Sequence, residues 1–240
     1  MKAVKKIKSF FSIPDTYIHK IENYSVVDAV MAVGLFFLYC LAMFFSGLIV
    51  NLISNFAMTV IGGVINLCFV CLVFGLLFLR KQGTETIGLK NGNIRLSLIM
   101  GTVLAAILFF GNCLSNIIFE GQQFISIGKI VINILYFYTV GLGEEVIFRG
   151  YIGTRLCGFI KNVYVVTVLT GILFVLMHFP FRMVAYHMTF MQLATNFPYM
   201  IDLFVTHLIL SFIHIKSDSL YGAILPHWVS DLSYSIVTHL

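Results

Sequence analysis

Long apolar runs separated by short polar breaks dominate the pattern of this chain. Each run is close to the roughly 20 residues that a helix needs to cross about 30 Å of hydrocarbon. The runs lack the strict alternation of barrel strands, so helices are the expected spanning elements. We expect spans over Val26–Ile53, Phe56–Leu79, Leu96–Phe119, Ile125–Ile160, Asn162–Phe179, Met200–Ile215 and Leu220–Val237.

The number of crossings depends on one stretch. Ile125–Ile160 is too long for one straight crossing and is interrupted by Gly141 and Gly143, so it makes one crossing or two. Pro180–Pro198 mixes aromatic and polar residues and is expected to be a connection. The predicted fold class is an all-α, polytopic transmembrane helix bundle of about seven or eight helices.

Composition agrees with this interpretation. The chain is 60% hydrophobic and 10% charged, whereas soluble domains carry about 25% charged residues. The expected location is therefore the cell membrane, as a multi-pass protein with membrane lipid around it. The net charge of +5 comes largely from the N-terminal stretch and the loops. No basic face could follow a nucleic acid, so no nucleic-acid partner is expected.

We divide the chain into three parts. Residues 1–25 form a basic segment in which Val4, Ile7 and Phe10 recur at helical spacing between lysines. This pattern favours a short amphipathic helix on an anionic membrane surface, with a frayed basic tail as the alternative. Residues 26–124 hold the N-terminal transmembrane helices, and residues 125–240 hold the expected catalytic core.

Ionisable side chains inside spans are costly and therefore mark candidate functional sites. They concentrate in three short segments of the C-terminal half. The segments are GLGEEVIFRGY with Glu144, Glu145 and Arg149, FVLMH with Phe174 and His178, and HWVSD with His227 and Asp231.

Helical spacing predicts how the first segment is organised. Glu145 and Arg149 are four residues apart, with the acid first, which favours an ion pair. Glu144 points about 100° away from Glu145 and has no local partner, and a desolvated carboxylate of this kind suits a general base. Phe174 shares a helix face with His178, as His227 does with Asp231.

Chain lengths predict that the first two segments meet. About 17 residues separate Glu144 from a turn at Lys161, and about 16 more lead to His178. Two antiparallel helices joined there would bring Glu144 and His178 to a similar depth. Pro226 is expected to kink the last span and open room for water beside His227.

Each motif alone has a structural explanation. EExxxR is often a salt-bridge face, FxxxH often places a histidine at the interface, and HxxxD can be a buried hydrogen-bonded pair. His207 and His214 lie on one face without a carboxylate neighbour, and we interpret them as packing or interfacial residues. The three motifs together, in this order, favour an active site.

In these residues the chain resembles the CAAX-protease and bacteriocin-processing family of intramembrane endopeptidases, also called CPBP or Abi. The family's motifs EExxxR, FxxxH and HxxxN/D match Glu144–Arg149, Phe174–His178 and His227–Asp231. SDSLYGAILPH before the last motif is also similar, and the resemblance covers roughly residues 125–240. It implies a fold like the type II CAAX prenyl protease, with a water-filled cavity that opens laterally.

The resemblance also implies roles. Glu144 and His178 would activate water, His227 and residue 231 would stabilise the oxyanion, and Glu145 with Arg149 would support the site. Many members carry asparagine where this chain has Asp231, and an ionised aspartate repels an oxyanion. Asp231 is therefore protonated, orients His227, or helps to hold a metal.

The metal question has two answers. The family is commonly called a metalloprotease, and zinc held by His178, His227 and Asp231 is the alternative to a metal-free reaction driven by glutamate. None of the tight HExxH-type spacings is present. We expect no certain cofactor, with zinc as the candidate divalent metal.

Three functions compete. The first is an intramembrane endopeptidase acting on a hydrophobic or lipidated peptide, such as a bacteriocin leader, a signalling-peptide precursor or a CAAX tail. The second is a non-catalytic membrane scaffold or bacteriocin-immunity protein. The third is a small transporter, whose charges should line a path across the membrane. Costly charges gathered in one place favour the endopeptidase. Arg155 and Lys161 argue for a site that faces outward, whereas the prenyl protease argues for a cytoplasmic opening.

Overall fold

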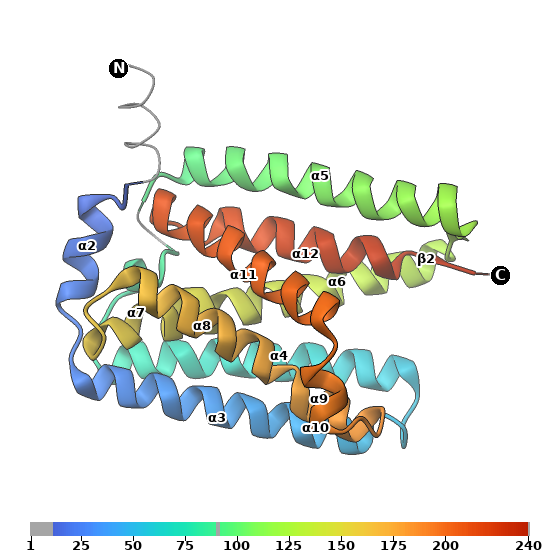
Figure 1. Ribbon diagram of the computed structural model, residues 1–240, viewed down its shortest axis with the longest axis horizontal. Coiled ribbons are helices and arrows are strands. Elements are labelled where there is room, and N and C mark those ends of the chain that lie inside the picture. The colour runs from blue at the N-terminus through green and yellow to red at the C-terminus, as the bar shows by residue number, and fades with distance from the viewer. Residues whose placement is uncertain (1–11, 90–91, 240) are drawn as a thin grey trace.

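The computed structural model describes residues 12–89 and 92–239. The first part holds α2 (Asp15–Glu22), α3 (Val26–Ile49), α4 (Asn55–Leu79), the 3-10 helix η1 (Thr84–Ile87), α5 (Ile94–Glu120) and β1 (Gln123–Phe124). The second part holds α6 (Ile127–Glu144), η2 (Glu145–Ile152), α7 (Gly153–Arg155), η3 (Leu156–Gly158), α8 (Val163–Met177), α9 (Phe179–Ala185), α10 (Phe190–Ala194), α11 (Phe197–Ser217), α12 (Tyr221–Ser235) and β2 (Val237–Thr238). The predicted all-α bundle is confirmed (Figure 1).

Six helical segments of the described chain are long and apolar enough to cross a membrane: Val26–Ile49, Asn55–Leu79, Ile94–Glu120, Ile127–Gly158, Val163–Ala185 and Phe197–Ser217. The shorter α12 runs among them and packs mainly against α5 and α6. Large apolar side chains cover the outside, such as Phe78, Phe119 and Ile127, each at least 80% exposed. Such a surface suits lipid, and the chain is a multi-pass membrane protein.

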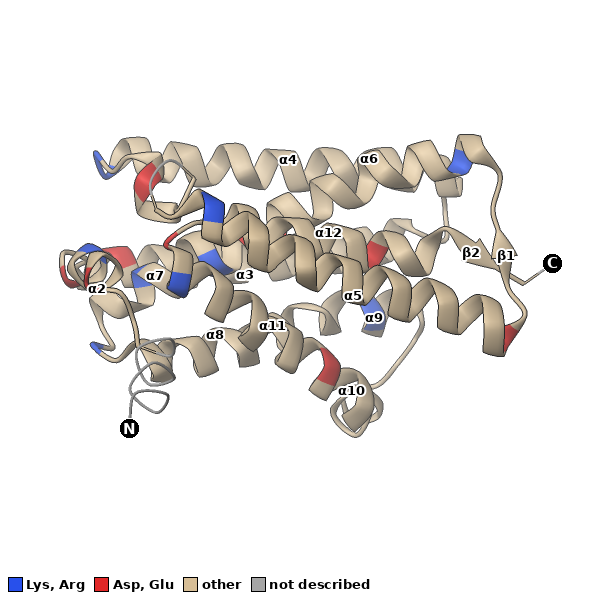
Figure 2. Ribbon diagram, turned by 90° about the horizontal axis from the view of Figure 1, so that it is seen from above, with Lys and Arg blue, Asp and Glu red and all other residues tan. Residues whose placement is uncertain are grey.

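The long helices alternate in direction between two ends of the molecule. At the α2 end lie α2, η1, α7 and the 218–220 turn, and at the β-ribbon end β1 pairs antiparallel with β2 (Figure 1). α3, α5, α8 and α12 run from the α2 end towards the β-ribbon end, and α4, α6 and α11 return. Figure 2 shows that Lys and Arg gather mainly at the α2 end.

The predicted N-terminal segment is only partly described. Residues 1–11, with Val4, Ile7 and Phe10, lie outside the described residues, and the remainder includes α2. α2 buries Tyr17 and Ile21 against the bundle. The next helix, α3, begins with a capping box, in which the Ser25 side chain accepts from the Asp28 N–H and the Asp28 carboxylate accepts from the Ser25 N–H.

The stretch Ile125–Ile160 makes one continuous helical element and not two crossings. Its glycines allow close approach of neighbouring helices without breaking the helix. A Cβ on Gly143 would lie 2.7 Å from the Asn66 side chain of α4, and one on Gly141 would lie 3.1 Å from the Trp228 backbone of α12. The expected connection at Pro180–Pro198 also differs, because α9 and α10 form within it.

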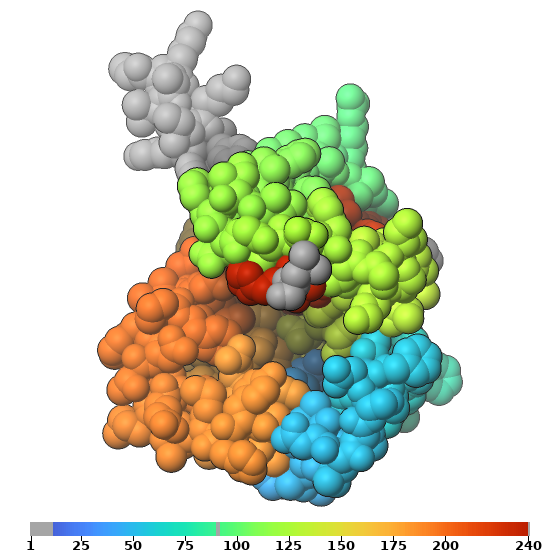
Figure 3. All heavy atoms as spheres, turned by 90° about the vertical axis from the view of Figure 1, so that its right-hand side faces the viewer, coloured from blue at the N-terminus to red at the C-terminus, as the bar shows by residue number. Residues whose placement is uncertain are grey.

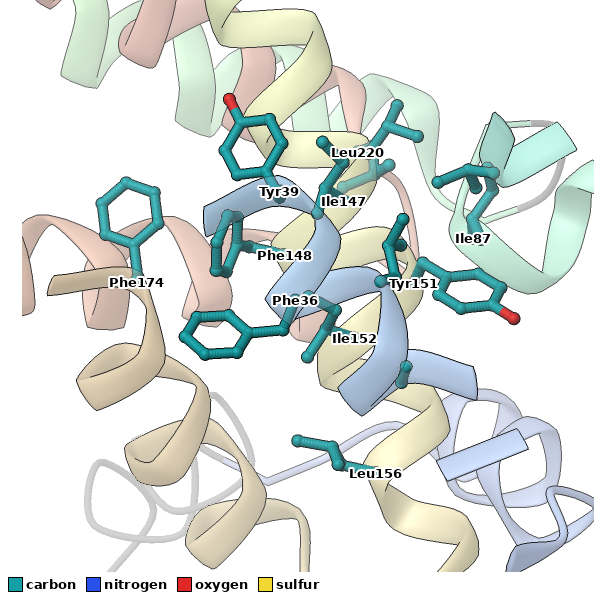
Figure 4. Close-up of a cluster of buried hydrophobic side chains, with 14 of the residues drawn as sticks. Phe36, Tyr39, Ile87, Ile147, Phe148, Tyr151, Ile152, Leu156, Phe174 and Leu220 are labelled. Carbon is teal, nitrogen blue, oxygen red and sulfur yellow. The ribbon is translucent and has the colours of Figure 1, made fainter. Parts of the chain in front are cut away.

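The core surrounds η2, a π-helical turn in the middle of the molecule. Ile147, Phe148, Tyr151 and Ile152 are completely buried, and Figure 4 shows them packed among side chains of α3, α8 and the α11–α12 turn. π-turns inside α-helices occur frequently at functional sites. Here the turn begins at Glu145, inside the first predicted motif.

Candidate active site

The predicted ion pair between Glu145 and Arg149 is confirmed. Both side chains are buried in η2, and Arg149 Nη1 donates to Glu145 Oε1 over 2.7 Å. The guanidinium also lies over the Phe174 ring, 4.4 Å from its centroid. Arg149 therefore joins the first motif to the second.

Glu145 has a second partner that the sequence did not predict. His227 of α12 places Nδ1 2.6 Å from the same Oε1 atom. An ionised carboxylate can only accept, so Nδ1 carries a hydrogen and His227 donates. Glu145 therefore fixes the orientation of the His227 ring, and the other ring nitrogen, Nε2, points away from Glu145.

The Nε2 atom of His227 lies between two more carboxylates. It is 3.6 Å from Glu144 Oε2 and 3.6 Å from Asp231 Oδ2, both longer than a normal hydrogen bond. A bare lone pair on Nε2 would face two carboxylates at once. At least one proton must therefore be shared among Nε2, Glu144 and Asp231.

His178 lies at the end of α8, where its Nδ1 is 2.8 Å from the Phe174 carbonyl oxygen. A carbonyl only accepts, so Nδ1 donates and Nε2 of the neutral ring is an acceptor. Phe174 lies between the two histidines, with ring centroids 5.1 Å from His178 and 6.2 Å from His227. In the described chain His178 forms no ion pair with a carboxylate.

The predicted common depth of Glu144 and His178 agrees with the helix packing. The rings of Phe148 and Phe174 meet edge to face at 5.2 Å. Glu144 precedes Phe148 by four residues and His178 follows Phe174 by four, on helices that run in opposite directions. Both therefore lie about 6 Å beyond this contact, towards the β-ribbon end.

Glu144 forms the inner end of a cavity of about 190 Å³. The wall combines polar and apolar groups from α3, α4, α6 and α9, namely Tyr39, Met43, Ser46, Met58, Gly62, Ile65, Asn66, Tyr136, Val140 and Phe181. Figure 3, viewed from the β-ribbon end, shows a hollow between α4, α6 and the α9–α11 region. Sequence reasoning missed this wall, although Asn66 is a polar residue in an apolar span and such residues are candidates for a role.

Asn66 is held in place at that wall. The Tyr39 hydroxyl donates to Asn66 Oδ1 over 3.0 Å, and Asn66 Nδ2 donates to the Gly62 carbonyl over 2.9 Å. The pair lies on α3 and α4, which the motif search did not cover. The wall therefore depends on the N-terminal helices as well as on the motif segments.

His207 and His214 are buried packing residues and not interfacial ones. His207 Nε2 lies 3.1 Å from the Ser211 hydroxyl, and its ring lies 5.5 Å from that of Phe174. The His214 ring meets Tyr17 of α2 edge to face at 5.8 Å. His207 thus supports the second motif from behind.

Pro226 does not interrupt α12, which continues to Ser235. A cavity of about 30 Å³ lies beside Pro226 and His227, between α5 and α11. This is room for one water molecule, as expected at this proline.

The proposed zinc ligands do not converge. Over residues 12–89 and 92–239, no three His, Cys, Asp and Glu side chains are arranged to hold a metal ion. His178 contacts Phe174, whereas both nitrogens of His227 face carboxylates. This donor set does not fit zinc, and we derive no step through a metal.

Comparison with known proteins gives one match. Residues 126–233 match the family model described as type II CAAX prenyl endopeptidase Rce1-like, and no curated protein or solved structure matches the chain. The matched segment contains all three motifs and indicates a protease with CAAX-type intramembrane activity. As the resemblance led us to expect, residues 126–233 of this membrane protein belong to the Rce1-like family.

Proposed function

We propose that this chain is an intramembrane endopeptidase that hydrolyses a membrane-associated peptide, with Glu144 and His178 activating the water. The observation that carries the proposal is the meeting of the three motifs at one cavity. Glu144 lies at its inner end, and His227 is fixed beside it by Glu145. A scaffold would not need this arrangement of costly charges.

Water activation follows from the acceptors. The Glu144 carboxylate takes one proton of the water, and the free Nε2 lone pair of His178 accepts the other O–H and orients the oxygen. The oxygen attacks the peptide carbonyl carbon. Catalytic contacts are often loose before substrate binds, so the absence of a direct Glu144–His178 contact in the described chain fits a bridging water.

His227 stabilises the charge that then develops. With its proton on Nε2, the ring donates to the carbonyl oxygen as that oxygen becomes negative. The Glu145 carboxylate balances the charge of the ring from the other side. Asp231, four residues along α12, orients the ring, and Arg149 keeps Glu145 ionised and in place.

The step closes without a further reactant. As the C–N bond breaks, Glu144 returns its proton to the leaving nitrogen, and the products are a new carboxylate and a new amine. A hydrophobic or lipidated peptide is the substrate class that the apolar part of the wall favours, through Met43, Met58 and Val140. Bacteriocin leaders, signalling-peptide precursors and CAAX tails belong to that class.

The test uses the purified full chain in detergent micelles and a library of internally quenched apolar peptides. We expect Glu144→Gln and His178→Ala each to lower the cleavage rate by about 10²- to 10⁴-fold. The matched control is Glu120→Gln, at the exposed end of α5, which should cleave at the unchanged rate.

Equal yield and melting temperature of all variants would show that folding is kept. Near-normal turnover by Glu144→Gln would overturn the assignment of the base. Peptide binding without cleavage by the unmodified chain would favour the non-catalytic scaffold.

A further inference from the structure

Basic residues divide unevenly between the two ends of the bundle. The α2 end carries Lys20, Arg80, Lys81, Arg95, Arg155, Lys161 and Lys216, whereas near the β-ribbon end the described chain has only Lys129 and Arg182. Short loops rich in Lys and Arg stay on the cytoplasmic side of a membrane. The α2 end is therefore the cytoplasmic end.

The cavity at Glu144 extends the other way. Its wall uses the late part of α3 from Tyr39 to Ser46 and the early part of α4 from Met58 to Asn66. α6 contributes residues between its start and Glu144, and α9 contributes Phe181. All of these segments lie on the β-ribbon side of Glu144, as does the hollow in Figure 3.

The opposite side of the site is closed by an apolar layer. Ile147, Phe148 and Ile152 follow Glu144 along the helix, and Ile87 and Leu220 pack at the same level, each completely buried (Figure 4). Gly150 lies so close to this layer that a Cβ there would be 3.0 Å from Leu220 and 3.2 Å from Ile87. No charged or polar path crosses the layer among these residues.

A second closure lies nearer the α2 end. Arg155 is fully buried, donates to Gln82 Oε1 over 2.8 Å and to Thr86 Oγ1 over 2.6 Å, and lies over the rings of Tyr24 and Tyr151. It thereby holds the η1 loop and the end of α2 across the bundle. Water and peptide have no entrance from this end.

We infer that the active site opens to the non-cytoplasmic face of the membrane. Its substrates are peptides presented from that face, either translocated or embedded in the outer half of the bilayer. A prenylated tail of a cytosolic protein would meet the closed end. The assignment of the face does not depend on catalysis, whereas the nature of the substrate rests on the proposed function.

The first experiment maps the ends by cysteine labelling of the full chain in intact cells, after the five native cysteines are replaced by serine. Asp15→Cys and Glu22→Cys report on the α2 end, and Leu52→Cys and Met191→Cys on the β-ribbon end. A membrane-impermeant maleimide should label the second pair at least tenfold more than the first, and permeabilisation should remove the difference. Labelling of Asp15→Cys or Glu22→Cys in intact cells would overturn the orientation.

The second experiment tests the opening itself. Met58→Cys, in the cavity wall, should react with a small charged methanethiosulfonate added to intact cells, and the matched control Ile152→Cys, in the apolar layer, should react from neither side. Reaction of Met58→Cys only in inside-out vesicles would overturn the inference. Either result stands whether or not any peptide is cleaved, so a failure of the proposed protease activity is read separately.

Discussion

Glu145 accepts hydrogen bonds from Arg149 and His227 on a single oxygen, so the loss of either donor disturbs the other. Arg149→Ala leaves a buried carboxylate with one donor fewer, and removal of one partner of a buried pair costs about 3–5 kcal/mol. We expect a lower melting temperature together with lost activity. The measurements are thermal unfolding and peptide cleavage, with the exposed Arg95→Ala as control. A stable and active Arg149→Ala protein would contradict the supporting role.

Asp231 differs from Glu145 because its side chain is one-third exposed and its nearest ring nitrogen is 3.6 Å away. If it only orients His227, an amide can replace the carboxylate, since it still offers an acceptor and adds a donor. We therefore expect Asp231→Asn to keep most of the activity, and a chelator to leave the unmodified chain active. Stoichiometric zinc by elemental analysis, lost along with activity in Asp231→Asn, would instead show a metal site that forms only with substrate or metal bound.

Some of these contacts follow from sequence spacing and others do not. The Glu145–Arg149 pair lies within one helix, so a spacing of four residues was enough to predict it. The Glu145–His227 bond joins residues 82 positions apart, and only the packing of α12 against η2 brings them together. The motif resemblance named both residues without indicating that they touch.

Helix packing depends on a few backbone contacts, and the closest joins α5 to α12. A Cβ on Gly101 would lie 2.5 Å from the Gly222 carbonyl oxygen, and one on Gly222 would lie 2.1 Å from that of Ser97. The Ser97 hydroxyl accepts from the Gly222 N–H over 2.8 Å, which fixes the crossing. This contact sets the position of α12 and therefore of His227.

We expect Gly101→Ala to push α12 away from α5, since backbone atoms cannot give way as a flexible side chain can. The melting temperature and the cleavage rate should both fall. Gly111→Ala, on the same helix with open space at its Cβ, should instead be neutral or slightly stabilising, because alanine is the better helix former. Equal melting temperatures for the two variants would contradict the role of the crossing.

At this scale hydrophobic runs predicted the long helices well, because length and apolarity are properties of each segment alone. The π-turn was not predictable, since nothing in EVIFRGYI distinguishes it from an α-helix. α9 and α10 were missed because aromatic and polar residues mix there without a clear period.

In the molecule as a whole, α2 is fastened to the turn between α11 and α12 through Lys20, which donates to Asp218, and Lys20 also lies over the Tyr17 ring. Burial lowers the pKa of Lys20, and the charge of Asp218 opposes that effect. The pair joins residues 198 positions apart, so no local pattern pointed to it.

Asp218→Asn should leave the Lys20 ammonium buried without a carboxylate and loosen α2. Asparagine tolerates the left-handed backbone at this position (φ 51°), so strain does not confuse the result. We expect a lower melting temperature and faster protease cleavage before residue 25, whereas Asp15→Asn, on the exposed side of α2, should match the unmodified chain. Unchanged protease sensitivity would show that other contacts hold α2.

The π-turn at η2 has a consequence for how this helix tolerates length changes. A π-turn accommodates one residue more than the α-helical turn it replaces. Deleting one residue within Val146–Phe148 would let the stretch relax into a regular helix, so the chain could still span the membrane. Everything after the deletion would rotate by about 100° relative to Glu144, and Arg155 would turn away from η1. The surplus residue thus acts as a phase shifter, which keeps the catalytic carboxylate and the cytoplasmic closure each facing its own partners along a single rod.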